Sequence, residues 1–442
     1  MRSWNRAEPA ADAGSVRGTG SKHAGPSSRP APAFGSYARK WNWGGILGWS
    51  GLLAITTVAE PYTPVSDDEV LERVPLGIRS ADVRRQREDL AQDPENLRDS
   101  LSMAGSYLET SRVEGDPRFL GYAQSILGPW WNQASPPLEV RVVRAEVFVL
   151  RFEFDRAQSE LEGVLAVDPD HGPAWAVSGE VFLARGDPKR ARDAFERARS
   201  SMTACASAIA MARCDRGVSG REASIRALEG WLPTVSPASD AGAAGSATVA
   251  QRQEILSLLA DARARQGAIE EAASAFAQGR RLGRRDVRIL VQEADFELDR
   301  DRPEAVIALA KGESAHDGLA VRLLEAWKRR GESDPEAVAR FEALRRQLEK
   351  RLEDRRARGD ASALPEEVRY WVRVRPDPVR ASERAEELWA VRRTLDDARW
   401  VLEAANLSES SGLRDRVGAW LRLHDIQEPR RGALRGPGKG SG

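Results

Sequence analysis

The 442 residues include 67 basic and 67 acidic side chains, so the formal net charge is zero and no long-range field draws the chain to nucleic acid. Apolar residues make up 41% and charged residues 30%, which is typical of a soluble folded protein. On one straight helix the two cysteines, Cys205 and Cys214, would point to opposite faces about 13 Å apart, too far for a disulfide. We interpret both as small buried apolar residues.

The first 59 residues divide into two segments of different composition. Residues 1–38 are rich in Gly, Ser, Pro and Ala without a hydrophobic period, which predicts a disordered arm. Arg39 and Lys40 then precede an uncharged apolar run at residues 41–59. A basic flank followed by such a run is typical of a secretory signal, and the run is also just long enough to cross a bilayer with tryptophan anchors. We expect residues 39–59 to be a signal peptide or a membrane anchor.

The remainder of the chain predicts helices, because Ala, Leu, Glu and Arg recur at helical spacing and strand signals are scarce. We divide it into a linker and first helix (60–92), a helical array (93–328, with a loop insertion at 233–249), a C-terminal helical region (329–428) and a disordered basic tail (429–442). Within the C-terminal region the predicted helices are 337–358, 366–375, 378–392, 395–405 and 412–423.

A repeat of about 34 residues is the most informative feature of the array. Small residues such as Gly179 and Ala191 recur where two antiparallel helices would approach closely, and large rings recur beside them. The residues predicted to pack in this way are Ala145, Phe148, Ala157, Trp175, Gly179, Phe182, Ala191, Phe195, Ala198, Ala272, Phe276 and Ala305.

The segment AWAVSGEVFLARGDPKRARDAFERAR, which begins at Ala174, resembles a near-complete tetratricopeptide (TPR) unit. The resemblance implies an all-α fold, a TPR-like solenoid of helix-turn-helix units that winds into a right-handed superhelix, here with a helical C-terminal extension. The segments VLERVP at residue 70, LGPWW at residue 127 and EEVRYWVRVRPDP at residue 366 also resemble a group of exported bacterial TPR proteins. That likeness implies an exported, periplasmic or membrane-anchored protein of the bacterial cell envelope.

Signatures of catalysis and of metal or cofactor binding are missing from the sequence. The four histidines form no pair at metal-ligand spacing, and the phosphate-binding, dinucleotide-binding and nucleophile-elbow motifs are absent. We therefore predict no enzyme activity, no catalytic residue, no metal and no cofactor. The arginine pairs alternate with acidic residues, which indicates solvated helix faces rather than a nucleic-acid surface.

Protein binding is the remaining prediction, because the first helix of each TPR pair lines the concave face. One station on these helices carries mostly carboxylates, and a station about one turn later carries arginines. Such stripes would suit a charged peptide, whereas ordinary solvated ion pairs are the alternative reading. The candidate partner-binding residues are Glu146, Val149, Glu180, Leu183, Asp261, Asp295, Arg151, Arg185 and Arg265.

The predicted function is a non-catalytic interaction scaffold that binds a protein or peptide on its concave surface and no nucleic acid. Membrane attachment would run through residues 41–59. The alternative is a structural component of the cell envelope that associates with copies of itself.

Overall fold

The computed structural model describes residues 85–426 apart from 86, 87, 91, 233–246, 284 and 332–334. All of these residues belong to one compact unit, Glu72–Gly442. The segments predicted as arm, signal or anchor, and basic tail lie outside the described residues, as do most of the linker and of the loop insertion.

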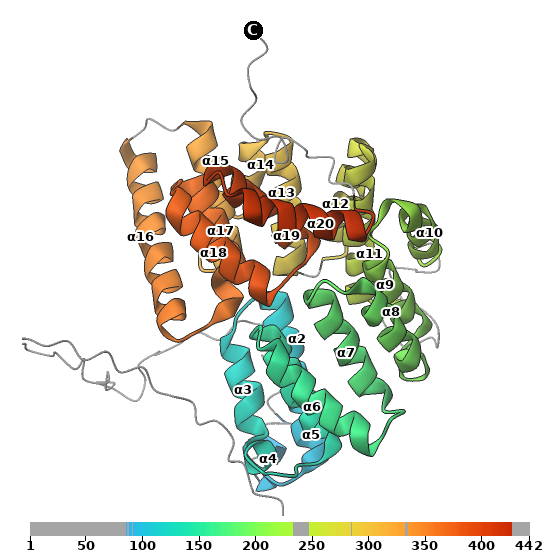
Figure 1. The fold of residues 1–442 in the computed structure, drawn as a ribbon. Helices are drawn as coiled ribbons and strands as arrows, with labels where there is room; N and C mark the ends of the chain where they lie inside the picture. The colour runs from blue at the N-terminus through green and yellow to red at the C-terminus, as the bar shows by residue number, and fades with distance from the viewer. Residues whose placement is uncertain are drawn as a thin grey trace, which may run out of the picture. The chain divides into compact units, whose positions relative to one another are not determined.

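Over the described ranges every regular element is helical, and consecutive helices pack side by side (Figure 1). The predicted all-α class is confirmed. The α-helices are α2 (Leu97–Glu114), α3 (Arg118–Ile126), α4 (Gly128–Trp131), α5 (Leu138–Leu150), α6 (Phe154–Val167), α7 (Gly172–Ala184), α8 (Pro188–Arg197), α9 (Ala204–Cys214), α10 (Val218–Glu229), α11 (Val249–Gln266), α12 (Ile269–Arg281), α13 (Val287–Asp299), α14 (Pro303–Leu309), α15 (Asp317–Arg330), α16 (Pro335–Ala357), α17 (Leu364–Arg369), α18 (Pro378–Val391), α19 (Leu395–Leu407) and α20 (Ser411–Leu423). Shorter 3₁₀ turns η2 (Ala198–Ser201) and η3 (Ala361–Ala363) and a π-helical turn η4 (Tyr370–Val374) complete the set.

Small side chains lie where the two helices of a pair approach most closely. Ala157, Ala191 and Ala272, one on the second helix of each of three pairs, are fully buried. A Cβ built on Gly179 would lie 2.5 Å from the ring of Phe195, which is itself 1% exposed. These small residues let the helix axes of the pairs α5–α6, α7–α8 and α11–α12 approach closely, as in a TPR-like solenoid. A larger residue at any of these positions would separate the axes.

The other predicted packing residues differ in exposure. Ala145, Phe148, Ala198 and Phe276 are buried, whereas Trp175, Phe182 and Ala305 are partly exposed. Trp175 lies at the surface, where Arg197 stacks over its ring at 4.5 Å and its indole N–H donates to the Pro169 carbonyl at 2.8 Å.

A residue with positive φ connects the two helices of several pairs. Between α7 and α8 this residue is Gly186, with φ 78°, and Asp187 then caps α8 by accepting from the Arg190 amide. Phe152, 34 residues earlier, occupies the same position between α5 and α6 with φ 61°. A phenylalanine in this conformation is strained by about 1–2 kcal/mol, so its ring contacts must compensate for the strain.

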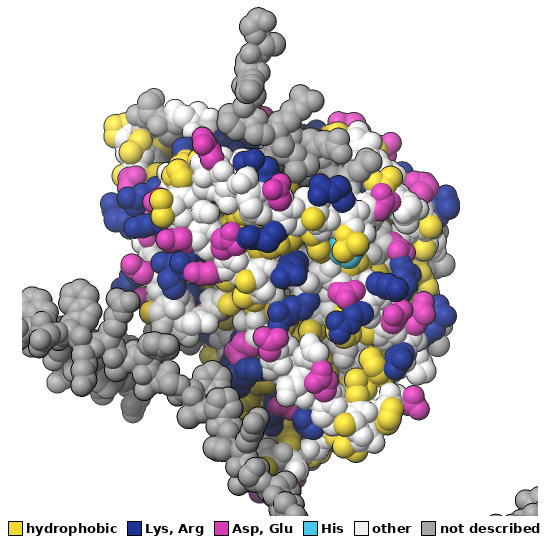
Figure 2. Space-filling model, viewed as in Figure 1, with side chains coloured by type: hydrophobic (Ala, Val, Ile, Leu, Met, Phe, Trp, Pro, Cys, Tyr) yellow, Lys and Arg dark blue, Asp and Glu magenta, His cyan; other side chains and the backbone are white. Residues whose placement is uncertain are grey.

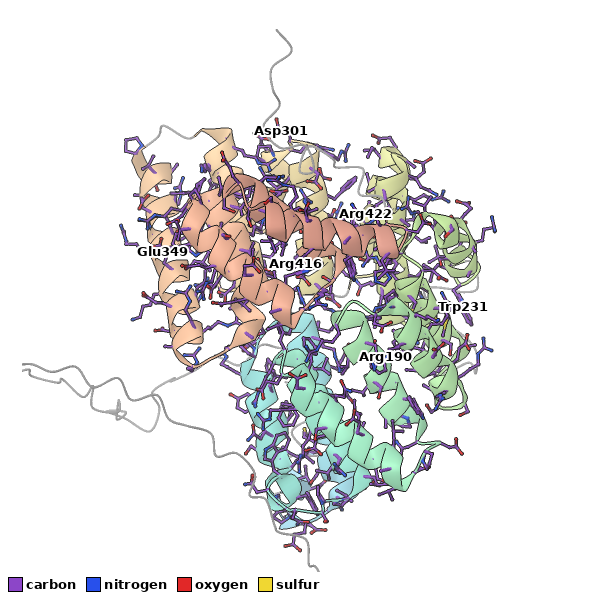
Figure 3. All side chains as sticks on the ribbon, viewed as in Figure 1. Arg190, Trp231, Asp301, Glu349, Arg416 and Arg422 are labelled. Atoms are coloured by element: carbon purple, nitrogen blue, oxygen red, sulfur yellow. The ribbon has the colours of Figure 1, made fainter. Side chains whose placement is uncertain are left out.

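The C-terminal third forms one large hydrophobic cluster that extends from Val287 to Leu421. Its helices lie within about two residues of the predicted ranges, except that 366–375 is divided between α17 and the π-helical turn η4. The predicted helical extension is therefore confirmed. In Figure 3, Arg416 is labelled on α20, where it forms an ion pair with Glu386 of α18.

The C-terminal helices return to the early helix pairs, a feature that the sequence did not predict. The Arg393 amide donates to the carbonyl of Ala184 at 2.8 Å, and the indole N–H of Trp420 donates to the carbonyl of Gly186 at 2.9 Å. Beyond α20, the carbonyl of Asp425 accepts from the amide of Val218 at 2.9 Å. Figure 1 shows α20 extending toward α10, and these bonds fix its far end there.

One aromatic contact joins the C-terminal region to the early helix pairs, and a second holds Trp420 within the C-terminal region. The guanidinium of Arg392 stacks over the ring of Phe152 at 4.4 Å, so the strained turn residue is covered from the C-terminal side. Trp420 also packs edge-on against Trp389 at 5.5 Å. The helical array is thus closed by its own last helices rather than left open at that end.

Candidate functional site

A groove of about 490 Å³ is lined by the first helices of successive pairs. Its walls come from α2, α5, α7, α9 and α11, with Ser201 and Met202 at one margin. A volume of this size is in the range of ligand-binding sites.

The floor of the groove is apolar. Val149, Val177 and Ile209 come from three successive first helices, and Ala176 and Ala206 lie beside them. Val177 and Ile209 are 8% and 5% exposed, so the surface they offer is narrow and shaped by the neighbouring small residues. Small side chains leave room for a ligand to bury apolar groups there.

Two ion pairs border this floor, and each joins neighbouring first helices. Arg112 on α2 donates to the carboxylate of Glu146 on α5 at 2.6 Å. Arg213 on α9 donates to both carboxylate oxygens of Glu180 on α7, at 2.6 and 2.7 Å. The charge of Glu180 raises the pKa of Arg213, so this guanidinium stays protonated at any physiological pH.

The partners in these ion pairs are one repeat period apart, at 34 residues for Arg112–Glu146 and 33 for Glu180–Arg213. The same spacing of 34 joins Arg263 to Glu229. Because equivalent positions on successive units are neighbours in a solenoid, opposite charges one period apart are brought into contact. The predicted carboxylate station is therefore largely a ladder of inter-unit ion pairs.

Glu254 on α11 is the third carboxylate in the groove wall, and it differs from the other two. It is partly buried, and it forms no hydrogen bond or ion pair with any residue in the described part of the chain. Its charge is felt at Arg213, where it adds to the larger effect of Glu180 in raising the pKa of that arginine.

Of the predicted binding residues, the structure brings Glu146, Val149 and Glu180 together in the groove. Leu183 lies elsewhere, packed against the buried cluster around Phe195. Arg151 donates to Gln124 at 3.1 Å.

Arg185 forms an ion pair with Asp155 and stacks over Phe154. Like Arg151, Arg185 caps the C-terminal end of its helix, where a cation is favourable whether or not a ligand is present.

Asp261 and Arg265 line a separate small cavity of about 30 Å³ between α9, α10 and α11. Arg265 donates to both oxygens of Asp261 at 3.0 Å, and Arg216 pairs with the same carboxylate. Burial alone raises the pKa of Asp261, but the two arginines outweigh burial and hold that pKa far below its usual range. This group is a fixed counter-ion in a space that holds about one water molecule.

Asp295 lies in the C-terminal part of the array, between two buried arginines. Arg322 donates to it at 2.8 and 2.7 Å, and Arg369, which is 1% exposed, pairs with it as well. Burial raises the pKa of Asp295, but the neighbouring guanidiniums outweigh it and the net shift is downward. Arg369 also donates to Glu325 at 3.0 and 2.7 Å, so Asp295 belongs to a structural network.

The sequence-based set missed several groove residues. Arg112, Arg213 and Glu254 line the groove, and Ile209 forms part of its floor. One signal could have found the arginines, since each lies one period from a carboxylate of the predicted station. Glu254 carries no such signal, because it lies outside the frame in which the carboxylates were counted.

Within the described ranges no group of three His, Cys, Asp or Glu side chains could hold a metal ion. His171 and His316 both act as helix caps, accepting from the amides of Ala174 and Leu319. Both cysteines are buried with free thiols. Among the helices that the structure describes, none is long and apolar enough to cross a bilayer.

Comparisons with known proteins add little to these observations. No protein family and no curated protein sequence matches the chain. Among solved structures, the chain is similar to one in the "Crystal structure of APC/C hetero-tetramer Cut9-Hcn1", with 14% sequence identity and a TM-score of 0.35 over 73% of this chain and 52% of that one. The chain thus spans about half the length of that structure. The helix pairs described above carry the assignment of a TPR-like fold.

Proposed function

We propose that this protein is a non-catalytic scaffold that binds a peptide segment of a partner protein in the groove along α2, α5, α7, α9 and α11. The groove itself supports the proposal, because it combines an apolar floor with charged walls on consecutive first helices. Charged side chains of both signs intersperse over the face in Figure 2, which would keep that face soluble.

The test compares two alanine-to-arginine variants. Ala176→Arg places a long side chain in the groove, whereas Ala166→Arg places the same side chain on the exposed surface of α6. Both positions are helical, so the change in helix propensity is the same. We expect Ala166→Arg to capture the same partners as the unmodified protein from the native cell envelope, and Ala176→Arg to lose them.

Circular dichroism of both variants controls for folding. Equal capture by the two variants would contradict a role for the groove. Sedimentation that grows without limit as the concentration rises, together with no captured partner, would favour the self-associating alternative.

We also propose that residues 41–59 direct export or hold the protein in the bacterial cell envelope. Support comes from the sequence alone, in the basic flank Arg39–Lys40 and the uncharged apolar run. Leu53→Arg in the centre of that run should retain the protein in the cytoplasmic fraction, whereas Thr57→Ser should not. Sequencing the N-terminus of the mature protein distinguishes a cleaved signal from a retained anchor.

A further inference from the structure

The walls of the groove carry an uneven set of charges. Three carboxylates, on Glu146, Glu180 and Glu254, face two guanidiniums, on Arg112 and Arg213. Two of the carboxylates are neutralised one-to-one by the arginines, which leaves the groove with one excess negative charge.

The bidentate pair of Glu180 and Arg213 is poorly placed to bind a ligand charge. Both oxygens of Glu180 are occupied by the two Nη atoms of Arg213, at 2.6 and 2.7 Å. A cation arriving at Glu180 would have to displace a bidentate guanidinium, and an anion arriving at Arg213 would have to displace a bidentate carboxylate. Neither exchange gains free energy unless the new pair is better than the one that it replaces.

Unlike Glu146 and Glu180, Glu254 is available to bind a cationic group of a ligand. It is partly buried in the α11 wall and has no hydrogen-bond or ion-pair partner among the described residues. A partly desolvated carboxylate gains more from a cationic partner than a fully exposed one does, because water screens it less. The apolar floor residues, including Ile209 on the neighbouring α9, line the same groove.

We infer that the groove selects a segment of a partner protein in which one Lys or Arg side chain, bound by Glu254, is flanked by aliphatic side chains that cover the floor of Val149, Val177 and Ile209. This inference rests on the proposed function and deepens it by naming the chemistry of the ligand. Charge complementarity argues for it, since a single cation balances the groove and an anion would add to its excess charge. The basic tail of the chain itself, residues 429–442, is the competing occupant.

The experiment uses three acetylated, amidated nonapeptides of alternating leucine and alanine that differ only at the central residue, which is lysine, norleucine or glutamate. Each carries a fluorophore, and dissociation constants are measured by anisotropy with the full chain at low and high salt. We expect the lysine peptide to bind about tenfold more tightly than the norleucine peptide at low salt, and the glutamate peptide to bind most weakly. High salt should reduce the differences in dissociation constant among the three peptides, because it screens the charge of Glu254.

Two variants locate the selectivity. Glu254→Gln should abolish the lysine preference while leaving the norleucine peptide unaffected. Glu271→Gln, an exposed carboxylate on α12, should change neither. A lysine preference that survives in Glu254→Gln would overturn the inference.

Further outcomes separate this inference from the proposed function and from the competing occupant. If no peptide binds the unmodified protein, or if binding shows no charge preference, the inference falls, whereas the proposed function is decided by Ala176→Arg alone. If deleting residues 429–442 strengthens binding of the lysine peptide tenfold or more, the tail occupies the groove, and the assignment to a partner protein is overturned.

Discussion

Two glycines within helices should respond to alanine in opposite ways. Gly105 lies within α2 and Gly179 within α7. Alanine in a helix interior is favoured over glycine by about 1 kcal/mol. Nothing lies within 4 Å of a Cβ added to Gly105, so Gly105→Ala should raise the free energy of unfolding by about that amount.

At Gly179 the same gain is opposed by a clash. The added Cβ would lie 2.5, 2.6 and 2.7 Å from three atoms of the Phe195 ring. Carbon atoms in favourable contact are about 3.5–4.0 Å apart, so the ring or the helix must move by about 1 Å. Overpacking a close-packed interior costs about 1–3 kcal/mol. After the propensity gain, Gly179→Ala should change stability by between about 0 and −2 kcal/mol.

The informative quantity is the difference between the two variants, because helix propensity cancels in it. That difference should be about 1–3 kcal/mol, read from urea midpoints followed by circular dichroism, with thermal midpoints several degrees apart. The double variant Gly179→Ala with Phe195→Leu should lose less stability than the two single variants added together. The difference should be at least about 0.5 kcal/mol, the smallest coupling expected of residues in contact. If Gly179→Ala raised the midpoint as much as Gly105→Ala, close helix approach at this glycine would be refuted.

Three further outcomes follow from buried groups. Burial raises the pKa of the Cys214 thiol to about 12, so iodoacetamide at pH 7.5 should leave Cys214 unmodified in the native protein and label it after unfolding, as mass spectrometry would show. Because the folded-state pKa of Asp295 lies below its ordinary value of 3.8, its contribution is present above about pH 4 and is lost as the pH falls further. Asp295→Asn should therefore flatten the acid limb of the stability curve. It should cost about 3 kcal/mol at pH 7, because two buried arginines lose a shared counter-ion and are left with Glu366 and Glu325. Trp420→Phe, which removes the N–H bonded to the Gly186 carbonyl, should cost about 1 kcal/mol and speed amide exchange both in α20 and at the α7–α8 turn, whereas an effect confined to α20 would contradict the contact.

Local patterns predicted the helix pairs well for a physical reason. Small residues at Ala157 and Ala191 and the Gly186–Asp187 turn act within a single unit, so their consequences can be read along one stretch of chain. The predicted C-terminal helices were nearly as close, because Asp377 caps α18 by local contacts with the backbone.

The candidate site was less predictable, because it depends on contacts between units. Glu146 and Glu180 lie on the first helices of their pairs, but their pairing with Arg112 and Arg213 depends on which residue of the neighbouring unit lies opposite. Glu254 became notable only when its surroundings showed no partner among the described residues. A lone glutamate in a chain that is 30% charged carries no signal of its own.

The return of α20 to the early helices also restricts how this protein can change in length. In an open solenoid a unit can be added or lost with little effect on distant ones, because each unit contacts only its neighbours. Here Trp420 and Gly186 are hydrogen-bonded across 234 positions, and Asp425 and Ser219 across 206. Inserting or removing one helix pair between them would shift one partner away from the other. Folding should also be slow to finish, because these contacts form only when the long stretch of chain between their partners has been closed into a loop.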